Sequence, residues 1–244
     1  MQFINHRTVE TLDGDGVEVK IDIFEGQKFT IERINIVGNT VTNDSVIRSA
    51  FIVDEGDPFS SLLVNKSINE VKARNIFGKV DYDVLPGSSD DLKVININVT
   101  EKATGEISAG AGFGTSGSTF GFGIKENNYL GQGIRVNTNL TFSDNSVKGE
   151  LSINNPNFKN SNNSLFTSIS NTSTDHLADY GYKSNISALS FGTNFERYED
   201  LYFYPTIDIN YEELTTTPKA STDLKKQEGD YFTTAFIYTF DYDK

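Results

Sequence analysis

Hydrophobic and polar residues alternate one by one through most of the region from residue 103 to residue 244. The segment from Tyr231 to Asp243 is the clearest case, with one face made of Phe232, Thr234, Phe236, Tyr238, Phe240 and Tyr242. Successive side chains of a β-strand point to opposite faces, so a period of two predicts a strand with two different faces. The pattern recurs in eight segments between turn residues, and we expect strands near residues 105–115, 118–126, 132–143, 146–154, 164–173, 183–196, 201–213 and 230–243.

The apolar residues of these segments gather on one face. The third expected strand has an apolar face made of Ile134, Val136, Leu140 and Phe142, and the seventh has one made of Leu201, Phe203, Pro205, Ile207 and Ile209. Long antiparallel strands with one apolar face are typical of transmembrane β-barrels. A soluble antiparallel sheet packed on a core is the alternative, but soluble sandwiches use shorter strands. The last expected strand reaches Lys244 with no later segment to pair with it, so we expect an incomplete barrel whose eight strands do not close alone.

Composition restricts the possible functions further. The 244 residues include no cysteine, which excludes a disulfide framework and thiolate chemistry. No run of 18 apolar residues is present, so the sequence predicts no membrane-spanning helix. The net charge of −13 and the lack of a basic stripe argue against nucleic-acid binding. The N-terminus lacks a basic segment followed by an apolar one, so no signal peptide is visible.

Two regions of mixed character precede the alternating strands. Residues 1–27 contain two strand-like runs joined by Asp13-Gly14-Asp15-Gly16, a hairpin turn signal, and we interpret them as the end of a domain. Residues 28–102 predict a complete small α+β domain with the order β-α-α-β-β. Thr42 or Asn43 can cap its first helix.

The connections between the expected barrel strands differ in length. The segments 174–182 and 214–229 are long and polar, and they lie at the same end of the strands. Bacterial barrels carry longer loops outside the cell and shorter turns in the periplasm, so we assign this end to the exterior. Because the number of strands is even, both ends of the strand region are then expected on the periplasmic side.

Several short motifs resemble the Omp85 superfamily of bacterial outer-membrane proteins. The motifs occur in a fixed order along nearly the whole chain. They are Gly38-Asn39, Glu55-Gly56, Arg74-Asn75-Ile76-Phe77-Gly78, Asn128-Tyr129-Leu130-Gly131-Gln132-Gly133 and Asn155-Pro156-Asn157-Phe158. The resemblance is strongest to the barrel-assembly branch. It implies that residues 1–27 end one POTRA domain, that residues 28–102 form the last POTRA domain, and that residues 103–244 form the first eight strands of an expected sixteen.

The resemblance also implies a function. Proteins of this branch lie in the outer membrane with their POTRA region in the periplasm, and they assemble and insert other β-barrels without enzymatic activity, cofactor or metal. The partners it implies are outer-membrane lipid, unfolded β-barrel substrates and periplasmic BamD-like lipoproteins of the assembly complex.

The first barrel strand is the candidate site for pairing with a substrate strand, as a lateral gate. It consists of Gly105, Glu106, Ile107, Ser108, Ala109, Gly110, Ala111, Gly112, Phe113 and Gly114. Glycine weakens a strand and leaves few side chains to lock a seam, although barrel strands also tolerate glycine at bends. With the family resemblance, we interpret this strand as one that exposes its edge.

The small α+β domain carries two further candidate features. The resemblance implies that Val80 to Leu85 is an edge strand able to accept partner strands, and that Arg48 and Glu55 dock the lipoprotein. The alternative for this charged pair is two solvated surface charges, which contribute little to stability.

The sequence leaves some alternative functions open and argues against others. A two-partner secretion transporter or an adhesin-assembly transporter of the same superfamily stays open, because these differ in segments outside residues 1–244. A barrel-anchored hydrolase would need a nucleophile with a base, and none is evident. Gly110, Gly112 and Gly114 lack the spacing of a nucleotide loop, and Asp13 to Gly16 lacks the ligands of a calcium loop.

Overall fold

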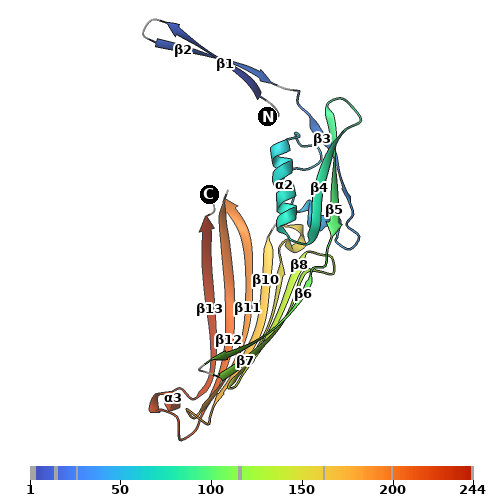
Figure 1. Cartoon of the computed structure of the whole chain (residues 1–244). Coiled ribbons are helices and arrows are strands. Elements are labelled where there is room, and N and C mark those ends of the chain that lie inside the picture. Colours follow the sequence, from blue (N-terminus) through green and yellow to red (C-terminus); the bar gives the residue numbers. More distant parts are fainter. Residues whose placement is uncertain are drawn as a thin grey trace. The chain divides into compact units, whose positions relative to one another are not determined.

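The computed structural model describes residues 4–13, 16–25, 27–114, 117–161, 163–198 and 200–242. The chain divides into two compact units, Met1–Lys102 and Ala103–Lys244 (Figure 1). Each unit is described by itself. No helix in the described ranges is both long and apolar enough to cross a membrane.

The first unit begins with an antiparallel hairpin of β1 (Ile4–Asp13) and β2 (Gly16–Glu25). The predicted turn at residues 13–16 has its two central residues outside the described ranges. The remainder of this unit contains β3 (Thr30–Val37), α1 (Asp44–Arg48), α2 (Ser61–Ala73), β4 (Phe77–Pro86) and β5 (Leu92–Glu101). The β-α-α-β-β order predicted from the sequence is therefore confirmed.

The three strands form a mixed sheet in the order β3-β5-β4, with β3 parallel and β4 antiparallel to the central β5. The helices supply the apolar residues that cover this sheet. The side chains that are fully buried in the resulting core include Ile31, Ile47, Val64, Val71, Ile95 and Ile97. Since strands and helices both contribute to it, the core holds the loops around α1 in a fixed geometry.

The ends of the two helices follow from local chemistry. The Ser60 hydroxyl accepts a hydrogen bond from the Leu63 N–H and caps α2. Asn43 occupies the N-cap position of α1, as predicted, but its side chain makes no cap hydrogen bond. Gly38 ends β3 with a φ of +98°, and a Cβ at this position would meet the Val99 carbonyl oxygen at 2.0 Å, so glycine is required.

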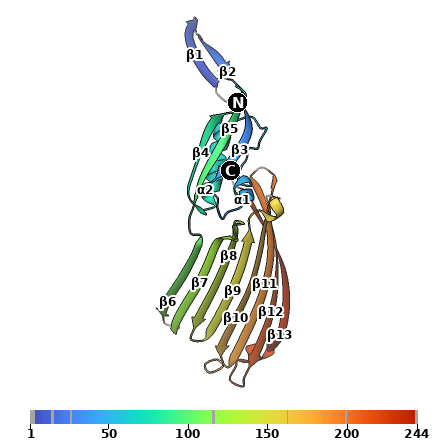
Figure 2. The same ribbon diagram turned by 90° about the vertical axis from the view of Figure 1, so that its right-hand side faces the viewer.

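The second unit is one antiparallel sheet of eight strands, each paired with its neighbours in sequence (Figure 2). Its strands are β6 (Gly105–Gly114), β7 (Gly117–Tyr129), β8 (Ile134–Ser143), β9 (Ser146–Asn155), β10 (Ser164–His176), β11 (Tyr182–Tyr198), β12 (Leu201–Thr216) and β13 (Gly229–Tyr242). All eight predicted strands are confirmed. The sheet does not close, since the pairing order runs from β6 to β13 without joining these two strands among the described residues.

Several boundaries differ from the prediction. Strand β7 continues to Tyr129, β10 to His176 and β12 to Thr216, so the two long loops are shorter than expected. The second of them contains a short helix, α3 (Thr222–Lys226), and a 3-10 turn (Phe158–Asn160) lies between β9 and β10. Polar residues extend these strands because inter-strand pairing, which is invisible locally, continues past the apolar segment.

The strand register places the apolar residues on one continuous face, which we call the apolar face. One row of directly opposed residues crosses all eight strands: Ile107, Ile124, Thr138, Leu151, Ile169, Leu189, Ile209 and Thr234. The opposite face, which we call the polar face, carries Ser, Thr, Asn, Gly and charged residues. Large side chains on the apolar face are exposed, including Phe113 at 82% and Phe240 at 68%, which indicates a surface made for a nonaqueous environment.

The apolar band crosses the sheet diagonally. On β6 it extends from the common row toward Phe113, whereas on β13 it extends from Thr234 eight residues the other way, to Tyr242. Because the two extensions run in opposite directions along the sheet, the band is oblique to the strands and not perpendicular to them. Barrel strands tilt by about 35–45° from the membrane normal, so the band lies level in a membrane only if these strands tilt as in a barrel.

Candidate functional site

Strand β6 is the edge of the eight-stranded sheet and consists of the ten residues predicted as the substrate-pairing site. In the described part of the chain it pairs only with β7, through ten directly opposed positions from Gly105–Glu126 to Gly114–Gly117. All ten residues are exposed. The other side of β6 therefore presents backbone N–H and C=O groups that a further strand can pair with.

The two halves of β6 are held differently. A Cβ at Gly123 on β7 would lie 2.7 Å from the Ser108 hydroxyl and 3.0 Å from the Asn139 amide oxygen, so these two side chains meet over that glycine. At Gly110, Gly112 and Gly114 an added Cβ would meet no atom within 4 Å. The space on the polar face beside the first half of the strand is thus filled by Ser108 and by Asn139 of β8, and the second half has open space on its polar face.

The POTRA-like domain has two edge strands, and these differ in how much of the free edge is covered by other residues. Strand β4 is an edge of the three-stranded sheet, so the predicted edge position of Val80 to Leu85 is confirmed, and its pairing with partner strands stays a prediction. The other edge, β3, is partly covered by its own domain. The Ile31 N–H donates to the Asp57 carbonyl, and the Gly56 N–H donates to the Ile31 carbonyl. Strand β4 is therefore the more open of the two edges.

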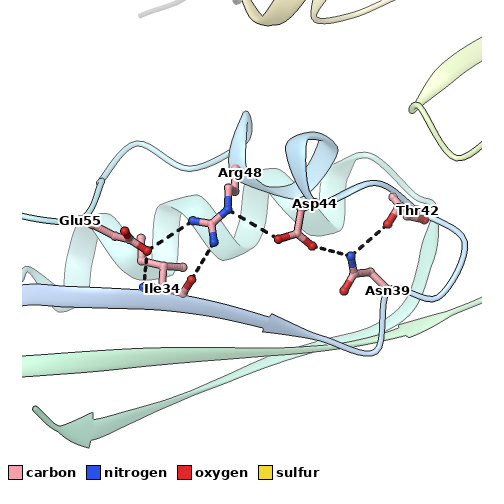
Figure 3. Close-up of polar contacts among 6 residues, drawn as sticks. All are labelled: Ile34, Asn39, Thr42, Asp44, Arg48 and Glu55. Carbon is pink, nitrogen blue, oxygen red and sulfur yellow. Dashed lines mark hydrogen bonds and ion pairs between the residues drawn. The ribbon is translucent and has the colours of Figure 1, made fainter.

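Arg48 and Glu55 continue this cover of β3, as Figure 3 shows. The Ile34 N–H donates to Glu55 Oε1 at 3.0 Å, and Arg48 Nη2 donates to the Ile34 carbonyl at 3.0 Å. The two side chains also form an ion pair, with 3.6 Å between Arg48 Nη1 and Glu55 Oε1. Together they take the place of a neighbouring strand at Ile34. Their docking role stays a prediction, and both side chains remain accessible, at 43% and 44% exposure.

The polar contacts continue from Arg48 along α1. Arg48 Nε lies 3.7 Å from Asp44 Oδ2, one helical turn earlier. Asn39 donates through Nδ2 to Asp44 Oδ1 at 2.7 Å and to the Thr42 carbonyl at 3.0 Å (Figure 3). The short helix α1 is therefore tied at both ends by side chains, with Val46 and Ile47 buried between them.

The Glu101 carboxylate at the end of β5 binds the loop that precedes α1. It accepts hydrogen bonds from the backbone N–H groups of Thr40, Val41 and Thr42, at 2.6 to 3.1 Å, and from the Thr40 hydroxyl at 2.6 Å. Burial alone would raise the pKa of Glu101, but these hydrogen bonds outweigh it and lower the pKa from 4.5 to about 2. We call this arrangement the Glu101 clamp.

Sequence reasoning did not find the Glu101 clamp. Glu101 lies 59 to 61 residues from its partners, and nothing in its local sequence distinguishes it from other surface acids. The only signal in the sequence was the position of Glu101, which follows the alternating apolar residues of a predicted strand.

Residue types that bind metals are not clustered within the described ranges. No three His, Asp or Glu side chains come together there in a way that could hold a metal ion. His176 lies between the rings of Tyr180 and Tyr182, at centroid distances of 5.5 and 5.2 Å.

Comparisons with known proteins agree with this architecture. The family model of the POTRA domain, described as surface antigen variable number repeat, matches residues 29–102. The outer membrane protein assembly factor BamA of Nitratidesulfovibrio vulgaris is 24% identical over 233 residues, covering 93% of this chain and 29% of that protein. BamA of Neisseria meningitidis is 28% identical over 144 residues, covering 58% of this chain and 18% of that protein. The chain thus spans less than a third of the length of these relatives.

Two solved structures share the fold. BamA from Haemophilus ducreyi lacking POTRA domains 1–3 gives a TM-score of 0.72 at 21% identity, covering 99% of this chain and 50% of that chain. CdiB from Acinetobacter baumannii gives a TM-score of 0.53 at 11% identity, covering 98% of this chain and 47% of that chain. The fold match is therefore better to BamA than to CdiB.

A POTRA domain followed by tilted antiparallel strands with a lipid-compatible face defines a class of outer-membrane protein. Residues 29–102 belong to the POTRA family, and the chain as a whole is similar to BamA proteins in sequence and fold. Both of the relatives described above are, by name, outer membrane protein assembly factors.

Proposed function

We propose that the protein containing this chain assembles and inserts other β-barrels into the outer membrane, and that β6 is the template for the incoming strand. The observation that carries the proposal is the edge position of β6, whose ten exposed residues pair on one side only within the described sheet. The names of the relatives, which are outer membrane protein assembly factors, support the same function.

The physical reason is the cost of unpaired backbone groups in lipid. Hydrocarbon cannot satisfy the N–H and C=O groups of an incoming strand, and each unsatisfied group costs several kcal/mol. A strand that adds to the edge of β6 forms its hydrogen bonds before it reaches the hydrocarbon region. This lowers the barrier to insertion without covalent chemistry, so the proposed function requires neither enzymatic activity nor a cofactor.

Site-specific photocrosslinking tests the template role. A photoreactive residue at Ser108 on the polar face of β6, or at Ala111 on its apolar face, is expected to capture unfolded barrel substrates in the full-length protein. Ser152 and Val147 on β9 are matched controls, because β9 is paired on both sides. Capture from the β9 positions at the same yield as from β6 would contradict the template role.

We further propose that the POTRA domain docks a periplasmic lipoprotein of the BamD type through Arg48 and Glu55. Both charges are accessible and held in a fixed geometry by Ile34. Glu55→Gln removes the charge but keeps an oxygen that can accept from the Ile34 N–H, so it separates docking from the cover of β3. Unchanged copurification of the lipoprotein with Glu55→Gln and with Arg48→Glu would count against the docking role.

A secretion transporter of the same superfamily is the second candidate, and the fold match to CdiB fits it less well than the match to BamA fits assembly. Depletion of the protein distinguishes the two functions. General loss of outer-membrane barrels supports assembly, whereas loss of one secreted partner with normal barrels supports secretion.

A further inference from the structure

The face of the eight-stranded sheet that carries the apolar band changes character at the end where α3 lies. Beyond the common row, the next two rows on β6 to β9 hold apolar residues and one glycine: Ala109, Phe122, Leu140 and Gly149, then Ala111, Phe120, Phe142 and Val147. On β10, β11 and β12 the same two rows hold polar residues and a tyrosine: Asn171, Ser187 and Tyr211, then Ser173, Asn185 and Glu213. The apolar face therefore ends in a polar area on these strands.

Six residues of this area and of the neighbouring β13 form one connected surface, which we call the rim patch: Asn171, Asn185, Ser187, Tyr211, Glu213 and Asp230. Asn171 Nδ2 donates to Asn185 Oδ1 at 3.1 Å and to Ser187 Oγ at 2.9 Å. Asn185 Nδ2 donates to Glu213 Oε2 at 3.4 Å. Asp230 is directly opposed to Glu213, and both carboxylates interact with the Tyr211 hydroxyl. These contacts order the side chains, although most of them stay exposed.

The oblique course of the apolar band places the rim patch just outside it. On β12 and β13 the apolar residues extend away from the patch, as far as the opposed pair Leu201 and Tyr242. If the band lies level in a membrane, the rim patch is at the height of the lipid headgroups, on the side of the sheet that faces lipid. The end with α3 is the end that loop length assigns to the exterior, so these are headgroups of the outer leaflet.

The chemistry of the rim patch fits the hydroxyl groups of sugars. Asn amides and the hydroxyls of Ser and Tyr can donate and accept hydrogen bonds, and carboxylates accept them, so a polyhydroxylated ring finds several partners. The patch contains two carboxylates and no Lys or Arg, so it repels a headgroup that is recognised through phosphate alone. One row further out, Lys183 is directly opposed to Asp175, and this pair adds no net charge.

We propose that the rim patch binds the sugar headgroup of an outer-leaflet glycolipid whose acyl chains lie against the adjoining apolar face. The continuity of the patch with the apolar face and its ordered donors and acceptors, without a basic residue, carry the inference. The site rests on the proposed function only in that the strands must cross an outer membrane. It lies on β10 to β13, so it does not involve the template strand β6.

Lipid retention by the full-length protein tests the rim patch. The protein is folded into phosphatidylcholine vesicles that contain either lipopolysaccharide with its core sugars or lipid A, which lacks them, and the lipid bound after detergent extraction is measured by native mass spectrometry. The wild type is expected to retain lipopolysaccharide in preference to lipid A. The double variant Asn171→Ala/Asn185→Ala is expected to retain about 3- to 10-fold less lipopolysaccharide, because the ordered amides are lost.

Asn210→Ala is the matched control, because Asn210 is next to Tyr211 on β12 but on the polar face. Its retention of lipopolysaccharide should equal that of the wild type, and gel mobility before and after heating verifies that each variant is folded. Equal retention of the two lipids by the wild type would overturn the sugar site. A loss in Asn210→Ala as large as in the double variant would overturn it too.

Glu213→Gln separates sugar binding from phosphate held by a bridging cation. Gln keeps an oxygen that can accept from Asn185 but removes the charge that a bridging Mg²⁺ would need. Retention of lipopolysaccharide should therefore stay within about 2-fold of the wild type, because the hydrogen bonds to sugar remain possible. A loss in Glu213→Gln as large as the loss that EDTA causes in the wild type would overturn sugar binding.

Assembly of a substrate barrel into vesicles of phosphatidylcholine alone separates the rim patch from the proposed function, because these vesicles contain no sugar headgroup. Selective retention of lipopolysaccharide by a protein that assembles no substrate overturns the function alone. Assembly by a protein that retains lipopolysaccharide and lipid A equally overturns the rim patch alone.

Discussion

The two units of this chain place their large hydrophobic side chains in opposite environments. The POTRA domain buries its apolar side chains in one core, where Ile31, Ile47 and Ile95 have no exposed surface. In the described part of the second unit, Leu214 in β12 and Ala220 in the loop after it are the only buried apolar residues, and large aromatic residues are exposed instead. The domain is specified by packing within the protein, whereas the sheet relies on lipid to complete its apolar face. Substitutions should therefore have different effects in the two units.

The largest difference is expected for truncation of an apolar side chain. Ile95→Ala in the core should lower the free energy of unfolding of the POTRA domain by about 2–5 kcal/mol, because it leaves a cavity. Ile169→Ala on the sheet, where the residue is 56% exposed, should cost less than about 1 kcal/mol in lipid. Urea unfolding with one Trp introduced in each unit measures both, since the sequence contains no Trp. Equal losses at the two positions would contradict the comparison.

A charge on the sheet tests the same contrast from the other side. Ile169→Arg places a cation on the apolar face and should destabilise the folded barrel by about 2–4 kcal/mol if it lies near the membrane midplane. Ser168→Arg places the same cation on the polar face, one residue away, and should be nearly neutral. Folding of the full-length protein into phospholipid vesicles across a urea series gives both values. A tolerated Ile169→Arg would mean that this face does not contact lipid.

The Glu101 clamp predicts a pH dependence that is confined to the POTRA domain. Its pKa of about 2 in the folded domain lies below the ordinary 4.5, so its stabilising contribution is complete above pH 4.5 and disappears as the pH falls toward 2. After allowance for solvent screening, we expect Glu101→Gln to cost roughly 1–2 kcal/mol at pH 7. The difference from the wild type should shrink between about pH 4.5 and 2. A difference that stays constant down to pH 2 would show that the clamp is not charged. Glu32→Gln is the control, since Glu32 also accepts from a backbone N–H, that of Ser88 at 2.6 Å.

The smallest expected effect distinguishes the two halves of β6. Gly110→Ala introduces a methyl group into open space and should be neutral or stabilise the strand by up to about 1 kcal/mol. Gly123→Ala would press on the Ser108 hydroxyl and on Asn139, and should destabilise the pairing of β6 with β7. Thermal unfolding in detergent compares the two variants. A destabilising Gly110→Ala with a neutral Gly123→Ala would reverse our description of the filled and open halves.

Sequence reasoning succeeded where the signal is local. The eight strands, the β-α-α-β-β order and the edge position of β4 all follow from periodicity, turn residues or resemblance, and the structure bears them out. Strand ends were less well predicted. Polar residues such as Thr174 and Thr216 extend β10 and β12 because their neighbours pair with them, and pairing partners are not encoded within a strand.

The alternation of side chains by itself determined that residues 103–244 form strands with one apolar face, because a period of two is a property of neighbouring residues. Only the tertiary structure decided what the charged residues of the POTRA domain do. Arg48 and Glu55 hold the edge of β3 at Ile34, and Glu101 binds the amides of residues 40–42, contacts that span up to 61 residues of sequence. Such contacts exist because the shared core brings the strand ends and α1 together, and no local pattern in the sequence records that approach.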